Sequence, residues 1–155
     1  MIVYHSMKES EINCVYDLIV RVFHDHVAPV YSDKGIDTFL SKISPTTLLE
    51  VNKGESSFVI VARQENILIG VLAVCKESHV ALIFVESQYQ GKGIGKGLID
   101  EAIKICQNRN PGLKSITVSS SPNSKTFYER IGFKAQSDEV DEDGMRYTPM
   151  QRILH

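Results

Sequence analysis

One glycine-rich stretch decides the fold, and it is Val85-Glu86-Ser87-Gln88-Tyr89-Gln90-Gly91-Lys92-Gly93-Ile94-Gly95-Lys96-Gly97-Leu98. It follows an apolar run at residues 80–85 and opens a segment whose apolar residues recur at intervals of three and four. The chain therefore passes here from a strand to an amphipathic helix. Closely spaced glycines let the backbone approach a ligand, and a helix N-terminus offers unpaired N–H groups with partial positive charge. The stretch predicts a cradle for a phosphate group.

Two common nucleotide-binding patterns fail at specific positions of this turn. The dinucleotide fingerprint Gly-x-Gly-x-x-Gly would need glycine where Lys96 or Leu98 stands. The P-loop would need glycine at Gln90, and Ser or Thr at Gly97 to hold magnesium. A generic nucleotide-binding domain is therefore disfavoured.

The rest of the chain predicts a mixed α/β (α+β) sheet protein. Nearly continuous apolar runs at 58–62 and 67–74, joined through 64–66, predict a hairpin of buried strands, and 114–119 predicts a further strand. Amphipathic spacing predicts a first helix entered through Ser10 and a second over 35–43, which Ser44-Pro45 ends. Two final strands are expected to flank the acidic stretch 138–144, itself a solvated turn.

Composition excludes several other classes. The chain has 155 residues, 43% of them hydrophobic, and a formal net charge of -2. It offers no overall basic field for nucleic acid and no apolar run long enough to cross a membrane. Cys14, Cys75 and Cys106 are widely spaced without a Cys-x-x-Cys pair, which is typical of reduced thiols in a cytoplasmic protein. No metal site is expected, because His24 and His26 do not share a helix face.

A second informative segment is Val118-Ser119-Ser120-Ser121-Pro122-Asn123-Ser124-Lys125-Thr126-Phe127-Tyr128-Glu129-Arg130-Ile131-Gly132-Phe133. It predicts a strand, a helix capped by Asn123 that carries Tyr128, and a Gly-Phe return into the core. Together with Gln90-x-x-Gly93-x-Gly95, this segment resembles the GNAT superfamily of acyl-CoA N-acyltransferases. The resemblance covers residue 58 to the C-terminus well and the N-terminal helices weakly.

The resemblance implies a single domain over residues 1–155. Its sheet would be strongly twisted, with about six to seven strands and about four flanking helices, and would splay open between the strands ending at Val85 and Ser119. Acetyl-CoA would be the co-substrate. Its pantetheine arm would bond the backbone of Phe84 and Val85, and Asn123 would contact the pantetheine or order its loop. The pyrophosphate would lie on a cradle ordered by Gln90 and made of Gly91, Lys92, Gly93, Ile94, Gly95 and Lys96.

The implied reaction is acetyl transfer to a primary amine through a tetrahedral intermediate. The Val85 N–H is the expected oxyanion donor, and Tyr128 the expected general acid to the CoA thiolate. A neutral amine is needed for attack, so a general base is required. Glu86 and His79 are candidates; if Phe84 faces the cleft, strict alternation turns His79 away, which favours Glu86. A non-catalytic acyl-CoA-binding module on the same fold is the alternative function.

The acceptor would be a small-molecule or protein amine. In this superfamily its pocket is built by the N-terminal helices and the last hairpin, so Tyr31, Phe39 and the end of the first helix near His24 are expected to line it. The acidic stretch could attract a cationic amine. The resemblance also makes a second copy of the chain, in a homodimer, a candidate partner.

Overall fold

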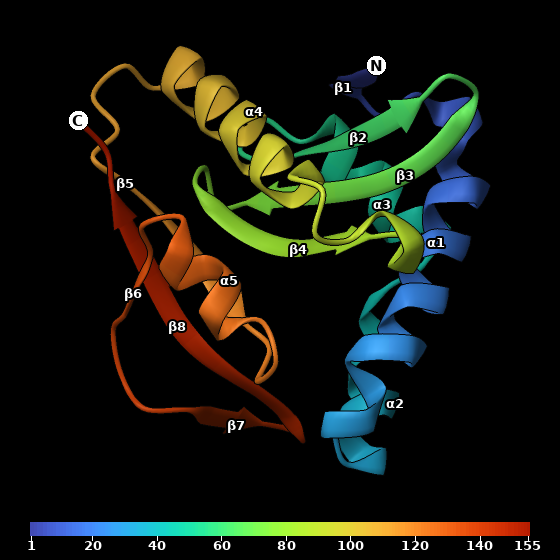
Figure 1. The fold of residues 1–155 in the computed structure, drawn as a ribbon, viewed down its shortest axis with the longest axis vertical. Coiled ribbons are helices and arrows are strands. Elements are labelled where there is room, and N and C mark those ends of the chain that lie inside the picture. The colour runs from blue at the N-terminus through green and yellow to red at the C-terminus, as the bar shows by residue number, and fades with distance from the viewer.

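The computed structural model describes residues 1–155, and its centre is a mixed eight-stranded sheet (Figure 1). The strand order is β1-β2-β3-β4-β5-β8-β6, with β7 paired to β8, and every pair is antiparallel except β4–β5. The strands are β1 (Ile2–Ser6), β2 (Phe58–Gln64), β3 (Ile67–Cys75), β4 (His79–Val85), β5 (Ser115–Ser120), β6 (Lys134–Ala135), β7 (Val140–Glu142) and β8 (Met145–Ile153).

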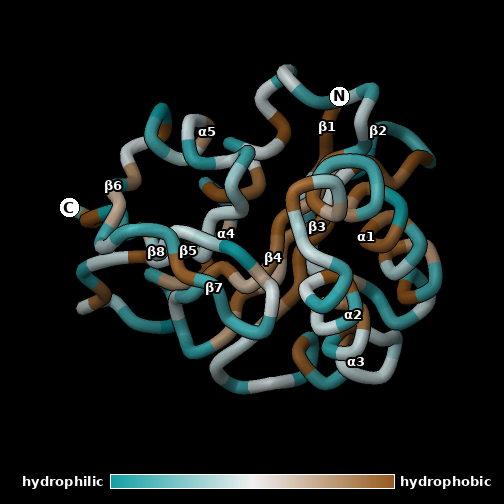
Figure 2. The backbone as a smooth tube through the Cα atoms, turned by 90° about the horizontal axis from the view of Figure 1, so that it is seen from below, coloured by the Kyte–Doolittle hydropathy of each residue, from teal (hydrophilic) through white to brown (hydrophobic).

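Five α-helices cover the two faces of this sheet, and their bounds are α1 (Ile12–His26), α2 (Asp33–Lys42), α3 (Pro45–Lys53), α4 (Ile94–Arg109) and α5 (Lys125–Arg130). Helices α4 and α5 pack on one face, where alternate residues of β2 and β3 meet Leu98 and Ile99. Helices α1 to α3 pack on the other face around Phe23 and Leu48. Figure 2 shows the hydrophobic strands β3 and β4 in the middle of the molecule, with α1, α2 and α3 on one side.

The sheet splays open between β4 and β5. These parallel strands are paired only at His79–Thr117 and Val80–Val118, after which they diverge. The divergence begins at a β-bulge: the register of β3 with β4 passes from Ala73–Leu82 to Val74–Val80, so Ala81 is left without a partner. A bulge bends its strand and increases the local twist. The predicted splay is therefore confirmed, and the extra residue gives its physical cause.

The structure corrects several details of the sequence prediction. There are eight strands and five helices, because β7 forms within the acidic stretch and α3 follows α2 directly. Pro45, expected only to end a helix, is the first residue of α3, whose first turn is capped by the Ser44 hydroxyl at 3.1 Å from the Thr47 N–H. Ser10 does not cap α1, because a 3-10 turn (Glu9–Glu11) comes first.

Candidate active site

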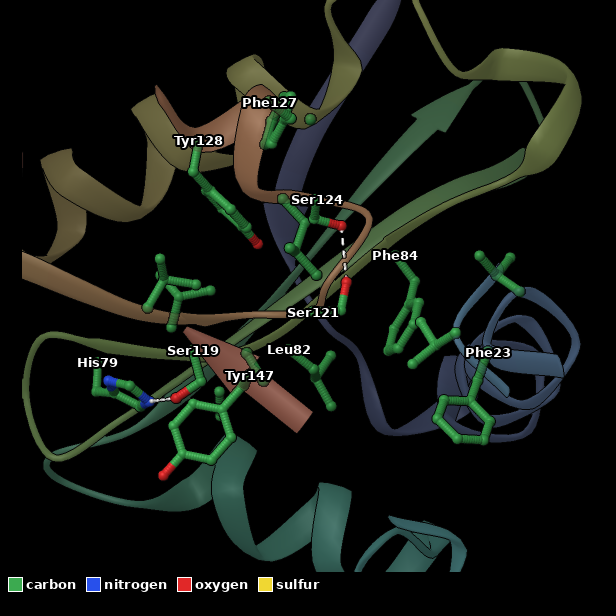
Figure 3. A pocket seen from close by; sticks show the side chains of 18 of the residues that line it. Phe23, His79, Leu82, Phe84, Ser119, Ser121, Ser124, Phe127, Tyr128 and Tyr147 are labelled. Atoms are coloured by element: carbon green, nitrogen blue, oxygen red, sulfur yellow. Dashed lines mark hydrogen bonds between the residues drawn. The ribbon is translucent and has the colours of Figure 1, made fainter. Parts of the chain in front are cut away.

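A cavity of about 1270 Å³ runs through the splayed opening, and 24 of its 42 lining residues are hydrophobic. One wall comes from α1, α2 and α3, and the opposite wall from the glycine turn, β5, α5 and β8. Strand β4 lines it from Val80 to Val85, between the two walls. The close-up in Figure 3 shows side chains from both walls pointing into this space. Segments from both halves of the sequence therefore build one continuous cavity.

The glycine turn forms the end of the cavity at the start of α4. Gly91 and Gly93 have φ of +78° and +83°, and a Cβ on either would meet nothing within 4 Å. These left-handed conformations favour glycine, and the space around them is open. No side chain caps α4, so the N–H groups of Ile94, Gly95 and Lys96 face outward without an internal partner. Uncapped N–H groups at a helix start suit a pyrophosphate, so these residues fit the diphosphate part of CoA.

Three side chains of the turn have roles inside the protein. The Gln90 amide donates to the Val85 carbonyl at 3.0 Å and so ties the turn to the end of β4. Lys92 lies over the Tyr89 ring, 5.3 Å from its centroid, and Lys96 is paired with Asp100 at 3.0 Å. The ordering of the turn thus comes from Gln90, whereas both lysines lie at the exposed surface.

The β5 side of β4 presents an open backbone edge to the cavity. The Glu86 N–H donates to the Ile69 carbonyl on β3 at 2.9 Å. Because backbone groups alternate sides along a strand, Phe84 also turns its N–H and C=O toward β3, while Ile83 and Val85 turn theirs toward the splay. Phe84 contributes its side chain to the cavity instead. An open edge of this kind can pair with amide groups of a ligand.

Tyr128 lies deeper than the sequence suggested. Its side chain is the buried one on α5, only 3% exposed, whereas Phe127 and Ile131 are half-buried. The rings of Phe127 and Phe133 stand edge-on to it at 5.1 and 5.5 Å. Burial raises the pKa of Tyr128 well above its ordinary value of about 10. Tyr128 is therefore a neutral O–H donor across the usual pH range, and Figure 3 shows its hydroxyl directed into the cavity.

Asn123 joins two parts of the chain that are far apart in sequence. It does not cap α5, whose N-cap is Ser124; its side-chain amide donates to the His26 carbonyl at the end of α1. The His26 ring in turn lies 2.8 Å from the Ser87 hydroxyl, just after β4. The end of α1 therefore bridges both arms of the splay, and Asn123 lines the cavity from this bridge.

The two candidate bases have different surroundings. Glu86 does not line the cavity, and its carboxylate is paired with the Arg21 guanidinium of α1. His79 does line it, and Figure 3 shows it beside Ser119. Strict alternation along β4 gave the wrong face for His79: Leu82 and Phe84 pack with the α1 side, but Val80 packs with the α4 side. The bulge at Ala81 reverses the alternation and turns His79 into the cavity.

His79 is held by two hydroxyls of β5. Its Nδ1 lies 2.8 Å from Thr117 Oγ1 and its Nε2 lies 3.3 Å from Ser119 Oγ. Burial, and to a lesser degree the charge of Lys76, lower the pKa of His79 below its ordinary value. The imidazole is therefore neutral at pH 7 and able to accept a proton.

The wall formed by the N-terminal helices is aromatic. Phe23 and Phe39 stack with ring centroids 4.1 Å apart, and Tyr31 and Phe84 stand edge-on to this pair. All four line the cavity, as does His26, whereas His24 does not. No group of three or more His, Cys, Asp or Glu side chains is arranged to hold a metal ion. None of the helices has both the length and the apolar composition needed to cross a bilayer.

Comparisons with known proteins agree with this geometry. The family model for an acetyltransferase (GNAT) domain matches residues 27–154. Among curated proteins, the chain is 34% identical over 65 residues to glucosamine 6-phosphate N-acetyltransferase of Trypanosoma brucei brucei, covering 42% of this chain and 43% of that one. It is 30% identical over 78 residues to the peptidyl-lysine N-acetyltransferase YjaB of Salmonella typhimurium, covering 50% of each. The chain thus spans about half the length of the curated relatives it matches.

Solved structures share the whole fold. The PaiA N-acetyltransferase of Thermoplasma acidophilum, solved in complex with coenzyme A, superposes with a TM-score of 0.80 at 21% identity and covers 99% of both chains. YncA of Salmonella typhimurium, solved with its cofactor acetyl-CoA, gives a TM-score of 0.73 at 15% identity over 100% of this chain and 95% of that one. At these identities the match concerns the fold.

Proposed function

The chain belongs to the GNAT acetyltransferase family, and from this premise we propose that it transfers the acetyl group of acetyl-CoA to a primary amine through a tetrahedral intermediate. The observation that carries the proposal is the uncapped glycine turn at the start of α4, open at Gly91 and Gly93, at one end of a cavity that continues along the free edge of β4. The turn would hold the pyrophosphate, and the cavity has room for the pantetheine arm and an acceptor together.

The free edge of β4 would serve both binding and catalysis. The N–H and C=O groups of Ile83 and the N–H group of Val85, whose carbonyl accepts from Gln90, would pair with the pantetheine amides. One of these N–H groups would also donate to the oxyanion that forms on the thioester carbonyl, as a fixed backbone donor that needs no reorganisation. Asn123, beside this edge, would order the loop before α5 and contact the pantetheine. Acetyl-CoA itself supplies the activated acyl group.

We propose that Tyr128, the expected general acid, stabilises the departing CoA sulfur by donating a hydrogen bond to it. Its buried phenol stays neutral, and no enclosed polar side-chain atom in the protein lacks a hydrogen-bond partner, so the Tyr128 oxygen, which bonds no protein group, opens on the cavity and can donate there. Phe127 lies against Gly95, since a Cβ there would come within 2.9 Å of the Phe127 ring. Helix α5 is thus fixed relative to the glycine turn, which favours a constant position for the Tyr128 hydroxyl.

We propose His79 as the general base, with the Ser119 hydroxyl as a relay. The imidazole is neutral, it lines the cavity, and Ser119 lies between its Nε2 and the centre of the cavity in Figure 3. A proton leaving the amine would reach Ser119 as that hydroxyl passes its own proton to His79. Glu86 is the weaker candidate, because it does not line the cavity and the Arg21 guanidinium occupies one of its oxygens.

A binding experiment tests the cofactor, and a pH profile tests the base. Acetyl-CoA and CoA, each at 100 times Kd, should stabilise the protein by about 2.7 kcal/mol, while NAD and ATP should not. A response to NAD or ATP alone would show that the turn binds another nucleotide. With an accepted amine, kcat/KM corrected for the neutral fraction of that amine should fall on acidification only below the ordinary imidazole pKa of about 6.5, because the pKa of His79 is lowered. His79→Gln should lower kcat about 10²- to 10⁴-fold. His155→Gln, at the C-terminus, is the matched control.

The alternative, a non-catalytic acyl-CoA-binding module, shares the glycine turn and the free edge of β4. It needs neither a proton donor nor a base in the cavity, so the presence of Tyr128 and His79 favours the enzyme. Stabilisation by acetyl-CoA without release of CoA in the presence of any amine would decide for the module.

A further inference from the structure

We infer that the acceptor is a small primary amine with an apolar, aromatic-sized body, rather than a protein lysine, a sugar phosphate or a polyamine. The inference rests on the proposed acetyl transfer and defines its second substrate. Two independent features carry it: the rim of the cavity on the α2 side is closed by the β7–β8 hairpin, and the walls behind that rim are apolar and nearly free of charge.

The rim is closed by contacts between the α2 region and the β7–β8 hairpin, which lie next to each other in Figure 1. The Thr38 hydroxyl lies 2.8 Å from the Asp143 carbonyl, and Arg146 donates to the Val30 carbonyl at 3.1 Å. Gly35 and Gly144 face each other without side chains, and a Cβ on Gly35 would overlap the Gly144 carbonyl. A polypeptide that presents a lysine needs an open groove for its flanking backbone, and this contact spans the place where such a groove would open.

Behind the rim, the acceptor side of the cavity is apolar. Phe39, Tyr31 and Leu82 are each half-buried, although the cluster around them is fully buried. Phe84 lies between Phe39 and the free edge of β4, with its ring 6.1 Å from that of Phe39. An aromatic or branched aliphatic group against these side chains would be removed from water, and its amine would point toward the open edge of β4.

Charges on the lining argue against the other acceptor classes. Only three lining residues carry a full charge, and they lie apart in the fold: Lys42 ends α2, Lys76 is in the turn between β3 and β4, and Glu142 ends β7. A phosphorylated acceptor would need clustered basic groups, and a polyamine would need clustered carboxylates. Glu142 is the single lining carboxylate, and it already accepts a hydrogen bond from the Tyr147 hydroxyl at 3.0 Å. Neither cluster is present.

The experiment compares kcat/KM for four amines with the full chain and acetyl-CoA, each corrected for its neutral fraction: 2-phenylethylamine, ethylamine, glucosamine 6-phosphate and a lysine-containing peptide. We expect 2-phenylethylamine to exceed ethylamine by at least about 10-fold, the gain from burying one aromatic ring, and to exceed the other two by more. Gly35→Ala, which suits a helix but separates α2 from the hairpin, should narrow the ratio of phenylethylamine to peptide. Gly112→Ala, after α4, where a Cβ would make only an ordinary contact with Asn110, should leave this ratio unchanged.

The outcomes separate this inference from the proposed function. Preference for the peptide or for glucosamine 6-phosphate would overturn the inference and leave the acetyltransferase standing. Equal rates with phenylethylamine and ethylamine would overturn the apolar subsite. Acetyl-CoA binding without turnover of any of the four amines would overturn the inference, and failure to bind acetyl-CoA would overturn the proposed function itself. Wild-type ratios decide the matter even if Gly35→Ala does not fold.

Discussion

Tyr128→Phe removes one oxygen from the cavity and leaves the aromatic packing of α5 in place. The pKa of the Tyr128 phenol lies above 10, whereas that of a thiol is ordinarily near 8.5. Complete transfer of the phenol proton to the CoA thiolate would therefore run uphill. The contribution of the phenol should instead be that of a hydrogen bond to a developing charge, about 1.5–3 kcal/mol. We therefore expect kcat to fall about 10- to 150-fold, less than the loss of a full general acid would give.

Stability should move little or slightly upward in this variant. The Tyr128 hydroxyl opens on the cavity and bonds no other protein group, so phenylalanine removes no internal hydrogen bond. The melting temperature is expected to stay within about 4 °C of the wild type, the shift that 1 kcal/mol produces in a domain of this size. Kd for acetyl-CoA is also expected to be retained.

The assay is steady-state release of CoA thiol at saturating amine, with Kd for acetyl-CoA measured by calorimetry. Tyr16→Phe is the matched control, because it makes the same chemical change on α1 outside the cavity. A loss of kcat smaller than about threefold in Tyr128→Phe would refute the role of the hydroxyl. A loss of Kd equal to the loss of kcat would show that Tyr128 serves binding and not departure of the thiolate.

Three further outcomes follow from the structure. Gly95→Asp should weaken acetyl-CoA binding about 100-fold or more, measured by calorimetry, since a carboxylate near a phosphate costs up to about 4 kcal/mol. Burial alone would raise the pKa of Glu11, but the Lys8 N–H and the Arg63 guanidinium, 2.6 Å away, hold this pKa below its ordinary value. The ionised carboxylate therefore stabilises the fold above about pH 4.3, and this stabilisation is lost as the pH falls through the lower folded pKa. On such acidification, the melting temperature of the wild type should fall more steeply than that of Glu11→Gln. Under native conditions a disulfide reagent should modify exposed Cys14 before Cys106, because burial raises the pKa of Cys106 to about 11. Mass spectrometry of partly labelled protein measures this order, and earlier labelling of Cys106 would contradict the prediction.

Much of the fold could be predicted because its strongest patterns are local. Continuous apolar strands and the glycine turn each follow from a few neighbouring residues, and β2, β3 and α4 lie where those residues indicated. Helix α3 was missed because Pro45 can end one helix or begin another, and the sequence alone does not distinguish the two. The short β7 was missed because it pairs only with β8, three to seven residues further on.

The candidate site was predictable where one segment makes it and not where segments meet. The uncapped start of α4 follows from the glycines themselves. Asn123 contacts the end of α1, 97 positions away in the sequence. Its local sequence predicted a helix N-cap instead, because a distant contact of this kind leaves no local pattern. His79 was placed on the wrong face of the sheet because the alternation of side chains assumes a strand without a bulge, and no residue type near Ala81 predicts one.

The unpaired Ala81 has a consequence for how relatives of this chain are aligned and engineered. Upstream of it, β4 follows one phase of alternation, and downstream it follows the other. Deleting this single alanine would leave Ile83 and Val85 where they are, yet carry the imidazole of His79 to the α4 side of the sheet and the apolar Val80 to the α1 side. In such a strand, a length change of one residue exchanges a polar group for an aliphatic one without any substitution. Comparisons that align only residue identities across β4 will therefore assign the wrong chemistry to this position whenever the insertion is not aligned first.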